Sequence, residues 1–360
     1  LNRLKKITKV VDRISVRNDY EFINAAFKET INSDNTIDLV FEIKEFEKQY
    51  LTRINILGNN VTDEKVIRDN LEVDEGDPFN SLLLAKSINN LKSLNIFGKI
   101  EYDLADDSGD KKILNINVEE KPTGEISAGA GTGTSGGTLA FGINENNFLG
   151  RNINLNTNLR LTEETIRGQF SVTNPNWSYS NKSLTTSFES SVTDRMSDFG
   201  YETSRTGFSF GSVWEQYDDI YFSPNVSTFY EKLDTNQSAS DKLKKQEGEY
   251  LDTNFKYSLD LDKRNQRFQT TDGFRSTFTQ NIPLVSEDYA FLNSYEFTTF
   301  NQIGESDMIT RFSILGRTIN SLSNEDVRIS KRLYVPSKRL RGFQVGKIGP
   351  VDDGDFIGGN

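Results

Sequence analysis

The sequence predicts an α+β domain followed by a large antiparallel β-barrel. Three observations support this fold class. Helical and strand patterns mix up to residue 122, the helical period disappears from Gly124, and alternation of apolar and polar residues then recurs in eleven segments. A length of 360 residues, at about 150 residues per domain, also favours roughly two units.

Residues 49–122 are expected to form a complete β-α-α-β-β domain. The apolar residues of 50–57 alternate, which predicts a short strand, and Gly58 is expected to end it. Thr62 is the expected N-cap of a first helix, because acidic residues follow it in the first turn, where the helix dipole favours anions.

A second helix and two strands complete this domain. Asn80 is expected to cap the helix, whose apolar residues then recur at i, i+4 and i+7. Gly98 is the expected stop of that helix. Alternation at 100–104 and 114–118 predicts the two strands.

Residues 1–46 are expected to be the C-terminal part of another domain of the same kind. Apolar residues alternate between Ile37 and Ile43, as in a strand. Ile43-Lys44-Glu45 corresponds to Val118-Glu119-Glu120, an offset of about 75 residues, which favours an array of small repeated domains. A single α+β domain with a ragged start remains the alternative.

Residues 124–360 read as consecutive antiparallel strands, the N-terminal part of a barrel. The segment 251–262 shows the pattern most clearly. One of its faces is expected to carry Leu251, Phe255, Leu259 and Leu261, and the other Asp252, Lys256 and Asp260. The predicted strands are 125–132, 138–145, 152–161, 166–173, 184–192, 205–214, 220–230, 251–262, 274–282, 287–300 and 308–316.

This alternation favours a membrane barrel over a soluble β-sandwich, which remains the alternative. Most of the segments have at least about nine residues, enough to cross a bilayer when tilted. Trp177 and Trp214 fall beside alternate turns, as in an interfacial aromatic girdle. The chain begins at Leu1 rather than Met and stops at Asn360, where a further strand would begin. We therefore expect it to be a piece of a longer protein.

The composition excludes most catalytic and metal chemistry. With 42 Lys and Arg against 53 Asp and Glu, the net charge of −11 disfavours nucleic-acid binding. The chain has no His and no Cys, which removes Ser-His and Cys-His nucleophiles, the common zinc sites and disulfides. Gly131 to Gly136 match G-x-G-x-x-G, but a strand pattern follows instead of a helix, so a hairpin is expected. We expect no enzyme, no cofactor and no metal.

Residues 326–343 form an unusual basic segment in this acidic chain. Five cationic side chains occur between Lys331 and Arg341. Such a segment is a solvated loop in most proteins, but in a barrel it could also fold inward to meet carboxylates of the lumen.

The tetrad Leu340-Arg341-Gly342-Phe343 resembles the motif on the sixth extracellular loop of the BamA family, the central subunits of the β-barrel assembly machinery. Arg53 to Asn59 and Glu75 to Asn80 resemble parts of a polypeptide-transport-associated (POTRA) domain. Val118 to Gly124 resembles the junction from the last POTRA domain into the barrel.

Two further turns resemble those of the same family. Asn147-Phe148-Leu149-Gly150-Arg151 is similar to the turn after the second strand, and Asp262-Lys263-Arg264-Asn265, ending at Gly273, is similar to a later turn. Asn265 replaces the usual Asp. The family barrel has sixteen strands, so the resemblance implies an incomplete barrel here, with Arg341 expected to reach into the lumen.

The resemblance implies assembly and insertion of β-barrel proteins into the outer membrane of a diderm bacterium, with the POTRA part in the periplasm. Implied partners are nascent outer-membrane β-barrel proteins, outer-membrane lipids and accessory lipoproteins that dock on POTRA domains, and no nucleic acid. The alternatives are a two-partner-secretion or autotransporter-assembly transporter of the same superfamily and, more distantly, a passive porin or receptor barrel.

The first barrel strand is the candidate lateral gate. It comprises Glu125, Ile126, Ser127, Ala128, Gly129, Ala130, Gly131 and Thr132. Its glycines provide no side chain for cross-strand pairs, which favours a seam that opens so that a substrate strand can add to the edge. The alternative is that these glycines serve a close backbone approach or a local bend.

Overall fold

The computed structural model divides the chain into two compact units. One contains residues 1–123 and Leu149–Asn152, and the other contains Gly124–Phe148 and Ile153–Asn360. Of the predicted partial domain at 1–46, residues 1–22, 32–36 and 46 lie outside the described residues. The structure describes residues 23–31, 37–45, 49–133, 136–197, 199–266, 269–304, 308–323, 326–335, 339–340, 342–343, 347–352 and 354–359.

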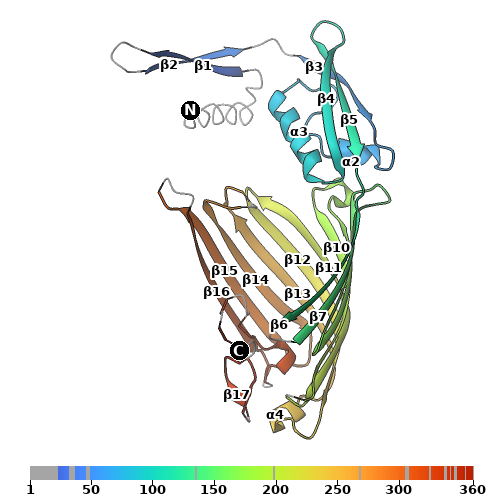
Figure 1. The fold of residues 1–360 in the computed structure, drawn as a ribbon, viewed down its shortest axis with the longest axis vertical. Helices are drawn as coiled ribbons and strands as arrows, with labels where there is room; N and C mark the ends of the chain where they lie inside the picture. Colours follow the sequence, from blue (N-terminus) through green and yellow to red (C-terminus); the bar gives the residue numbers. More distant parts are fainter. Residues whose placement is uncertain are drawn as a thin grey trace. The chain divides into compact units, whose positions relative to one another are not determined.

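The first unit contains a three-stranded sheet with two helices. The sheet has the order β3-β5-β4, with β3 parallel and β4 antiparallel to β5. The apolar stripe predicted for the second helix is buried against this sheet, so the helix forms because one of its faces completes the core. The elements are β3 (Tyr50–Leu57), α2 (Glu64–Arg68), α3 (Ser81–Ser93), β4 (Phe97–Asp106) and β5 (Lys111–Glu120) (Figure 1).

Two of the predicted helix boundaries are wrong by a few residues. The N-cap of α2 is Asp63, whose carboxylate accepts the N–H of Lys65, whereas the Thr62 hydroxyl hydrogen-bonds Glu120. Asn95, with φ 57°, follows α3 in the left-handed conformation, a role that asparagine tolerates, and Gly98 lies inside β4. The predicted cap Asn80 is confirmed, since its side chain accepts the N–H of Leu83.

An antiparallel hairpin precedes this sheet along the chain. It consists of β1 (Ile23–Ile31) and β2 (Ile37–Glu45), paired from Ile23 with Glu45 to Ile31 with Ile37. Like β5, β2 ends at the Lys-Glu or Glu-Glu pair from which the sequence repeat was inferred.

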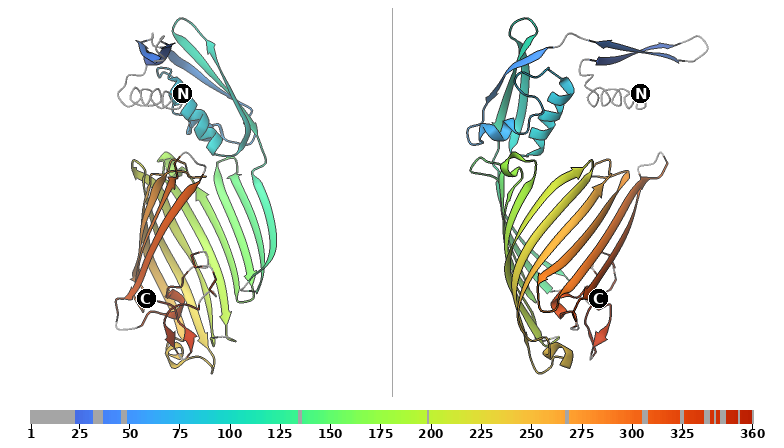
Figure 2. Two further views of the ribbon diagram at one scale, coloured as in Figure 1. Left: turned by 60° about the vertical axis from the view of Figure 1, so that its left-hand side comes forward. Right: turned by 180° about the vertical axis from the view of Figure 1, so that it is seen from behind.

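The second unit is a curved wall of eleven antiparallel strands, which confirms the predicted strand number (Figures 1 and 2). Each strand pairs with the next along the chain, and β6 and β16 are the two edges, so the barrel is incomplete. The strands are β6 (Gly124–Gly133), β7 (Gly136–Phe148), β8 (Ile153–Thr162), β9 (Thr165–Asn174), β10 (Ser183–Arg195), β11 (Tyr201–Tyr217), β12 (Ile220–Thr235), β13 (Gly248–Asp262), β14 (Gly273–Val285), β15 (Ala290–Gln302) and β16 (Ile309–Ser321).

Four shorter elements accompany the wall. Two are connections between strands, and two follow β16. They are the 3-10 helix η1 (Trp177–Tyr179), α4 (Asp241–Lys244), the 3-10 helix η2 (Ile329–Lys331) and the short hairpin β17 (Val351–Asp352) with β18 (Asp355–Phe356).

The two faces of the wall differ as the alternation predicts. On β13, Leu251 and Leu259 are exposed at 52% and 41%, whereas Asp252 on the opposite face is 2% exposed. Large apolar side chains are exposed along the other strands as well, including Phe170, Phe188, Phe208, Val226 and Ile314. We call this the apolar face, and the opposite one the polar face. After β16, Arg328 and Ser330 contact the polar face through Asp252 and Glu231.

Candidate functional site

The first strand of the wall has a free edge. β6 pairs with β7 along its whole length, from Gly124 with Glu145 to Gly133 with Gly136, and within the described residues it pairs with no other strand. Ile126 on this strand is 83% exposed. In the part of the barrel present here, the main-chain groups on the open side of β6 therefore have no partner strand.

The glycines of β6 are not explained by close packing. A Cβ added to Gly129 or to Gly131 would meet no atom within 4 Å. The structure thus contradicts a close backbone approach as the reason for glycine at these two positions. What remains is a local bend, or the effect of glycine on the strand itself, which it makes more flexible and leaves without side-chain pairs.

The turn after the second strand requires its glycine. In Asn147–Arg151, Leu149 and Gly150 have φ of 56° and 70°. A Cβ on Gly150 would lie 2.0 Å from the carbonyl oxygen of Val61, which belongs to the same compact unit, and the Gly150 carbonyl accepts the N–H of Asp63 at 2.8 Å. No larger residue fits there.

The turn between β13 and β14 is built from its charged residues and its glycine. The carboxylate of Asp262 accepts two guanidinium N–H groups of Arg264, both at 2.7 Å. Asn265, which departs from the family pattern, accepts the N–H groups of Thr271 and Asp272 at 3.2 and 3.3 Å. Its amide oxygen therefore provides acceptors for these N–H groups, as a carboxylate would. Gly273 has φ 97°, and a Cβ there would lie 2.2 Å from the Lys263 carbonyl oxygen.

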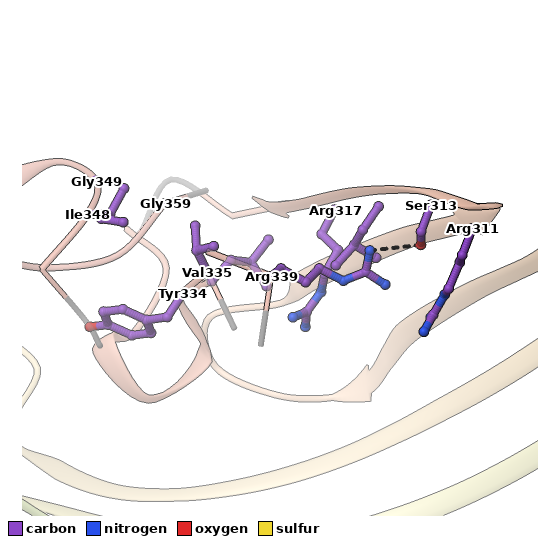
Figure 3. A pocket seen from close by; sticks show the side chains of 11 residues that line it. Arg311, Ser313, Arg317, Tyr334, Val335, Arg339, Ile348, Gly349 and Gly359 are labelled. Carbon is purple, nitrogen blue, oxygen red and sulfur yellow. Dashed lines mark hydrogen bonds between the residues drawn. The ribbon is translucent and has the colours of Figure 1, made fainter. Parts of the chain in front are cut away.

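The basic tetrad is described only in part, since Arg341 lies outside the described residues. Leu340 is half-buried, Gly342 has φ 84°, and Phe343 is 62% exposed. Just before the tetrad, Arg339 donates to the Ser313 hydroxyl at 3.1 Å (Figure 3). Arg339 also pairs with Glu296.

Arg339 lines a cavity of about 930 Å³ beside β16. Figure 3 shows Arg311, Arg317 and Arg339 around it. The full lining is Arg311, Ser313, Leu315, Arg317, Leu333, Tyr334, Val335, Arg339, Ile348, Gly349 and Gly359. Lys331 also binds carboxylates of the polar face, at 2.9 Å from Asp252 and 2.5 Å from Asp288. At Arg339 and at Lys331, the basic segment therefore pairs with carboxylates of the wall. This agrees with the second possibility in the sequence analysis, in which the segment folds inward.

The sequence analysis missed the role of Glu120 at the end of β5. Its carboxylate accepts three successive backbone N–H groups, from Asn60 at 3.0 Å, Val61 at 2.9 Å and Thr62 at 2.6 Å. Burial alone would raise the pKa of Glu120, but a hydrogen bond from the Thr62 hydroxyl, together with these three backbone N–H groups, outweighs burial and lowers the pKa below its ordinary value. Glu120 thereby holds the loop between β3 and α2.

The stability of this unit is expected to depend on pH through Glu120. Because the pKa is lower in the folded state, its contribution is present above the ordinary glutamate pKa of about 4.3 and is lost as the pH falls through the folded value. Glu120→Gln is expected to cost about 1 kcal/mol at pH 7. Urea unfolding of residues 49–123 at pH 7 and pH 3 measures this, with the adjacent exposed Glu119→Gln as control. An equal loss at both pH values would contradict the assignment.

Two observations limit the chemistry of the described residues. Within them, no group of three or more acidic side chains is arranged to hold a metal ion. None of the helices in the described ranges is long and apolar enough to span a bilayer.

These features define the class of an outer-membrane-type β-barrel wall joined to a POTRA-like domain. A family model described as the Omp85 superfamily domain matches residues 147–360, and a POTRA model described as surface antigen variable number repeat matches residues 49–121. The chain belongs to the Omp85 superfamily.

Relatives within this superfamily confirm the resemblance to the BamA family. The chain is 24% identical to the outer membrane protein assembly factor BamA of Neorickettsia risticii, over 96% of the chain and 48% of the relative, so it spans about half that relative's length. The solved structure of BamA from Haemophilus ducreyi lacking POTRA domains 1–3 matches with TM-score 0.72 at 19% identity, covering 100% of this chain and 74% of the other. CdiB from Acinetobacter baumannii matches with TM-score 0.54 at 12% identity, covering 94% and 64%.

Proposed function

We propose that this chain is part of a factor that assembles and inserts β-barrel proteins into the outer membrane, with the edge of β6 as the template. A substrate strand cannot enter hydrocarbon with unpaired backbone groups, each of which costs several kcal/mol. An edge that offers main-chain donors and acceptors satisfies them by strand addition and tolerates many sequences. The glycines of β6 are the observation that carries this proposal, because a Cβ added to Gly129 or Gly131 would meet no atom within 4 Å and packing therefore does not require glycine there.

The POTRA-like unit has its own free edge, which supports a role in receiving partners. Within the described residues, β4 pairs only with β5. The opposite edge strand, β3, is partly covered, because Leu51 exchanges hydrogen bonds with Gly76 and Asp77 and the Ile54 N–H is bound by Glu75. We infer that β4 is where periplasmic substrates or accessory lipoproteins would add.

A secretion transporter of the same superfamily is the second candidate, because the barrel fold is shared with CdiB. The assembly function is favoured because the curated relative that aligns over 96% of the chain is an assembly factor. A passive porin is disfavoured, since a POTRA model matches residues 49–121. No catalytic step or cofactor belongs to the proposal.

Disulfide crosslinking tests the gate directly. In the full-length protein, Gly129→Cys is expected to form a disulfide with a cysteine in the last strand of an arrested barrel substrate. The open space around Gly129 accepts the new side chain without a clash. The 360 residues contain no native cysteine that would compete.

Leu159→Cys is the matched control. Leu159 lies on β8, where both edges are occupied, by Phe141 of β7 and Gly168 of β9, and it is expected not to crosslink. Equal crosslinking at 129 and 159, or none at 129, would contradict strand addition at β6. Crosslinking of a secreted passenger instead of a barrel strand would favour the transporter.

A further inference from the structure

The segment that follows β16 is among the most buried parts of the second unit. We call Val327–Arg332 the strap. Val327, Arg328 and Ile329 are only 2–3% exposed. Arginine is rarely buried to this extent unless it is paired, so the partners of Arg328 decide what the strap does.

The Arg328 guanidinium meets three carboxylates from three parts of the wall. It lies 2.9 Å from Asp252 of β13, 3.4 Å from Glu231 of β12 and 3.3 Å from Asp288 in the connection between β14 and β15. It also stacks on the ring of Tyr250, at 3.7 Å from the ring centroid.

A second cation completes the cluster. Lys331 binds Asp252 and Asp288 and lies 3.2 Å from the Ser286 hydroxyl. The Ser330 hydroxyl donates to Glu231 at 2.5 Å. Two cations of the strap thus share three carboxylates of the wall, all at least 93% buried.

Apolar contacts fix the strap on both sides of this cluster. Val327 belongs to a cluster with Ala290 and Ile319, and Ile329 belongs to one with Tyr201, Leu233, Ala239 and Leu243. Apart from Pro283, all buried apolar residues described in the second unit belong to these two clusters. Their strand positions lie at one end of the meander, so the strap binds several connections of that end together.

The buried ion pairs of the strap are better suited to fixing its position on the wall than to increasing the free energy of unfolding. Burial of ions costs free energy that pairing seldom recovers, whereas fixed charge geometry specifies one arrangement. The pairing here is incomplete, because Asp288 Oδ2 and Arg328 Nε have no hydrogen-bond partner among the described residues. Apolar contacts alone would allow the strap to shift along the wall, because they are not directional.

We propose that the strap is a latch that holds the start of the motif-bearing loop against the polar face, with Arg328 and Lys331 as its positioning residues. From the strap the chain runs to Leu333, which exchanges hydrogen bonds with Gly359, and then to Arg339 at the wall. The latch and Arg339 therefore bracket the approach to residues 340–343. The role of the latch rests on the proposed function, whereas its geometry rests on the ion cluster alone.

Labelling of a cysteine beneath the strap tests the latch in the full-length protein in membranes. Ala290 is 4% exposed and packs with Val327, so Ala290→Cys in the otherwise unchanged chain is expected to react slowly with an impermeant maleimide. Adding Arg328→Met and Lys331→Met is expected to raise the labelling rate at least about tenfold, roughly 1.4 kcal/mol in the opening equilibrium. Heat-modifiable migration on gels reports whether the barrel remains folded.

A second variant tests whether the charges position the strap without leaving unpaired buried charges that would destabilise the barrel. It replaces the double variant if that variant does not fold. It adds Glu231→Gln, Asp252→Asn and Asp288→Asn, so that no buried charge is left unpaired. This variant is expected to remain folded and still to label at least about tenfold faster.

Arg275→Met is the matched control. It breaks the pair with Asp260, also on β13, without touching the strap, and is expected to leave labelling within about twofold of the parent. Protection restored in the neutral variant, unchanged labelling in both variants, or an equal increase with Arg275→Met would overturn the latch. None of these readouts involves a substrate, so failure of crosslinking at Gly129 would instead overturn the assembly function alone.

Discussion

Val226→Arg is expected to destabilise the folded wall by about 2–4 kcal/mol. Val226 lies near the middle of β12, is 41% exposed on the apolar face, and is flanked by Phe210 and Phe255 on the neighbouring strands. If this face contacts lipid, as the proposed function requires, a guanidinium there loses its hydration. Urea titration of the full-length protein folded into lipid vesicles measures the cost.

Ser227→Arg is the matched control, one residue further along the strand. Ser227 points to the polar face, between Ser209 and Asn254, where water and polar groups can solvate the charge. Its expected cost is within about 1 kcal/mol. Equal costs at 226 and 227 would mean that neither face is in contact with hydrocarbon.

Gly58→Ala is expected to destabilise the POTRA-like unit by about 2–4 kcal/mol, the sum of a left-handed backbone penalty and a steric clash. Gly58 has φ 90°, and a Cβ there would lie 2.0 Å from the carbonyl oxygen of Val118. That carbonyl belongs to β5, so it cannot move without disturbing the sheet.

Gly76→Ala isolates the two contributions. Gly76 has φ 97°, similar to Gly58, but a Cβ added there meets nothing within 4 Å. It is expected to cost only the backbone penalty of about 1–2 kcal/mol. Thermal unfolding of residues 49–123 compares the two variants, and costs that are equal would show that the loop relaxes away from Val118.

The architecture follows from short-range information in the sequence. A strand period of two, repeated eleven times, is sufficient to predict the number and order of strands, because each strand of the meander pairs with its neighbour in the chain. The core stripe of α3 was predictable for the same reason, since residues one turn apart share a face.

Local competition explains the misplaced boundaries. Thr62, Asp63 and Asn95 could each end or begin a helix by their chemistry, and tertiary contacts decide among such residues. The Thr62 hydroxyl hydrogen-bonds Glu120, and Asp63 caps the helix. The residue pattern of the helix itself could not predict this contact, because the carboxylate of Glu120 comes from the end of β5.

The buried ion cluster was only partly predictable. The basic composition of 326–343 indicates that cations there need partners, and the acidic polar face indicates carboxylates. Which carboxylates pair with Arg328 depends on contacts across 40 to 97 residues of sequence. Residues 236–247, between β12 and β13, are mostly polar, and their composition does not predict that Leu243 is buried in one cluster with Ile329.

The order of the strands concentrates the entropic cost of loop closure in one pairing, the one that would join the first and last strands of a closed barrel. Every pairing in the wall joins consecutive strands, so each closes only a short loop of chain. A meander that closes on itself needs one further pairing, and it must join edges that lie roughly 200 residues or more apart. Since loop closure costs about 0.6 kcal/mol per doubling of length, that seam costs about 3–4 kcal/mol more than a tight hairpin. A substrate strand already held beside β6 therefore competes with the last strand of the same barrel, whose pairing with β6 carries this larger loop-closure cost. The pairings between consecutive strands of the meander do not carry that cost.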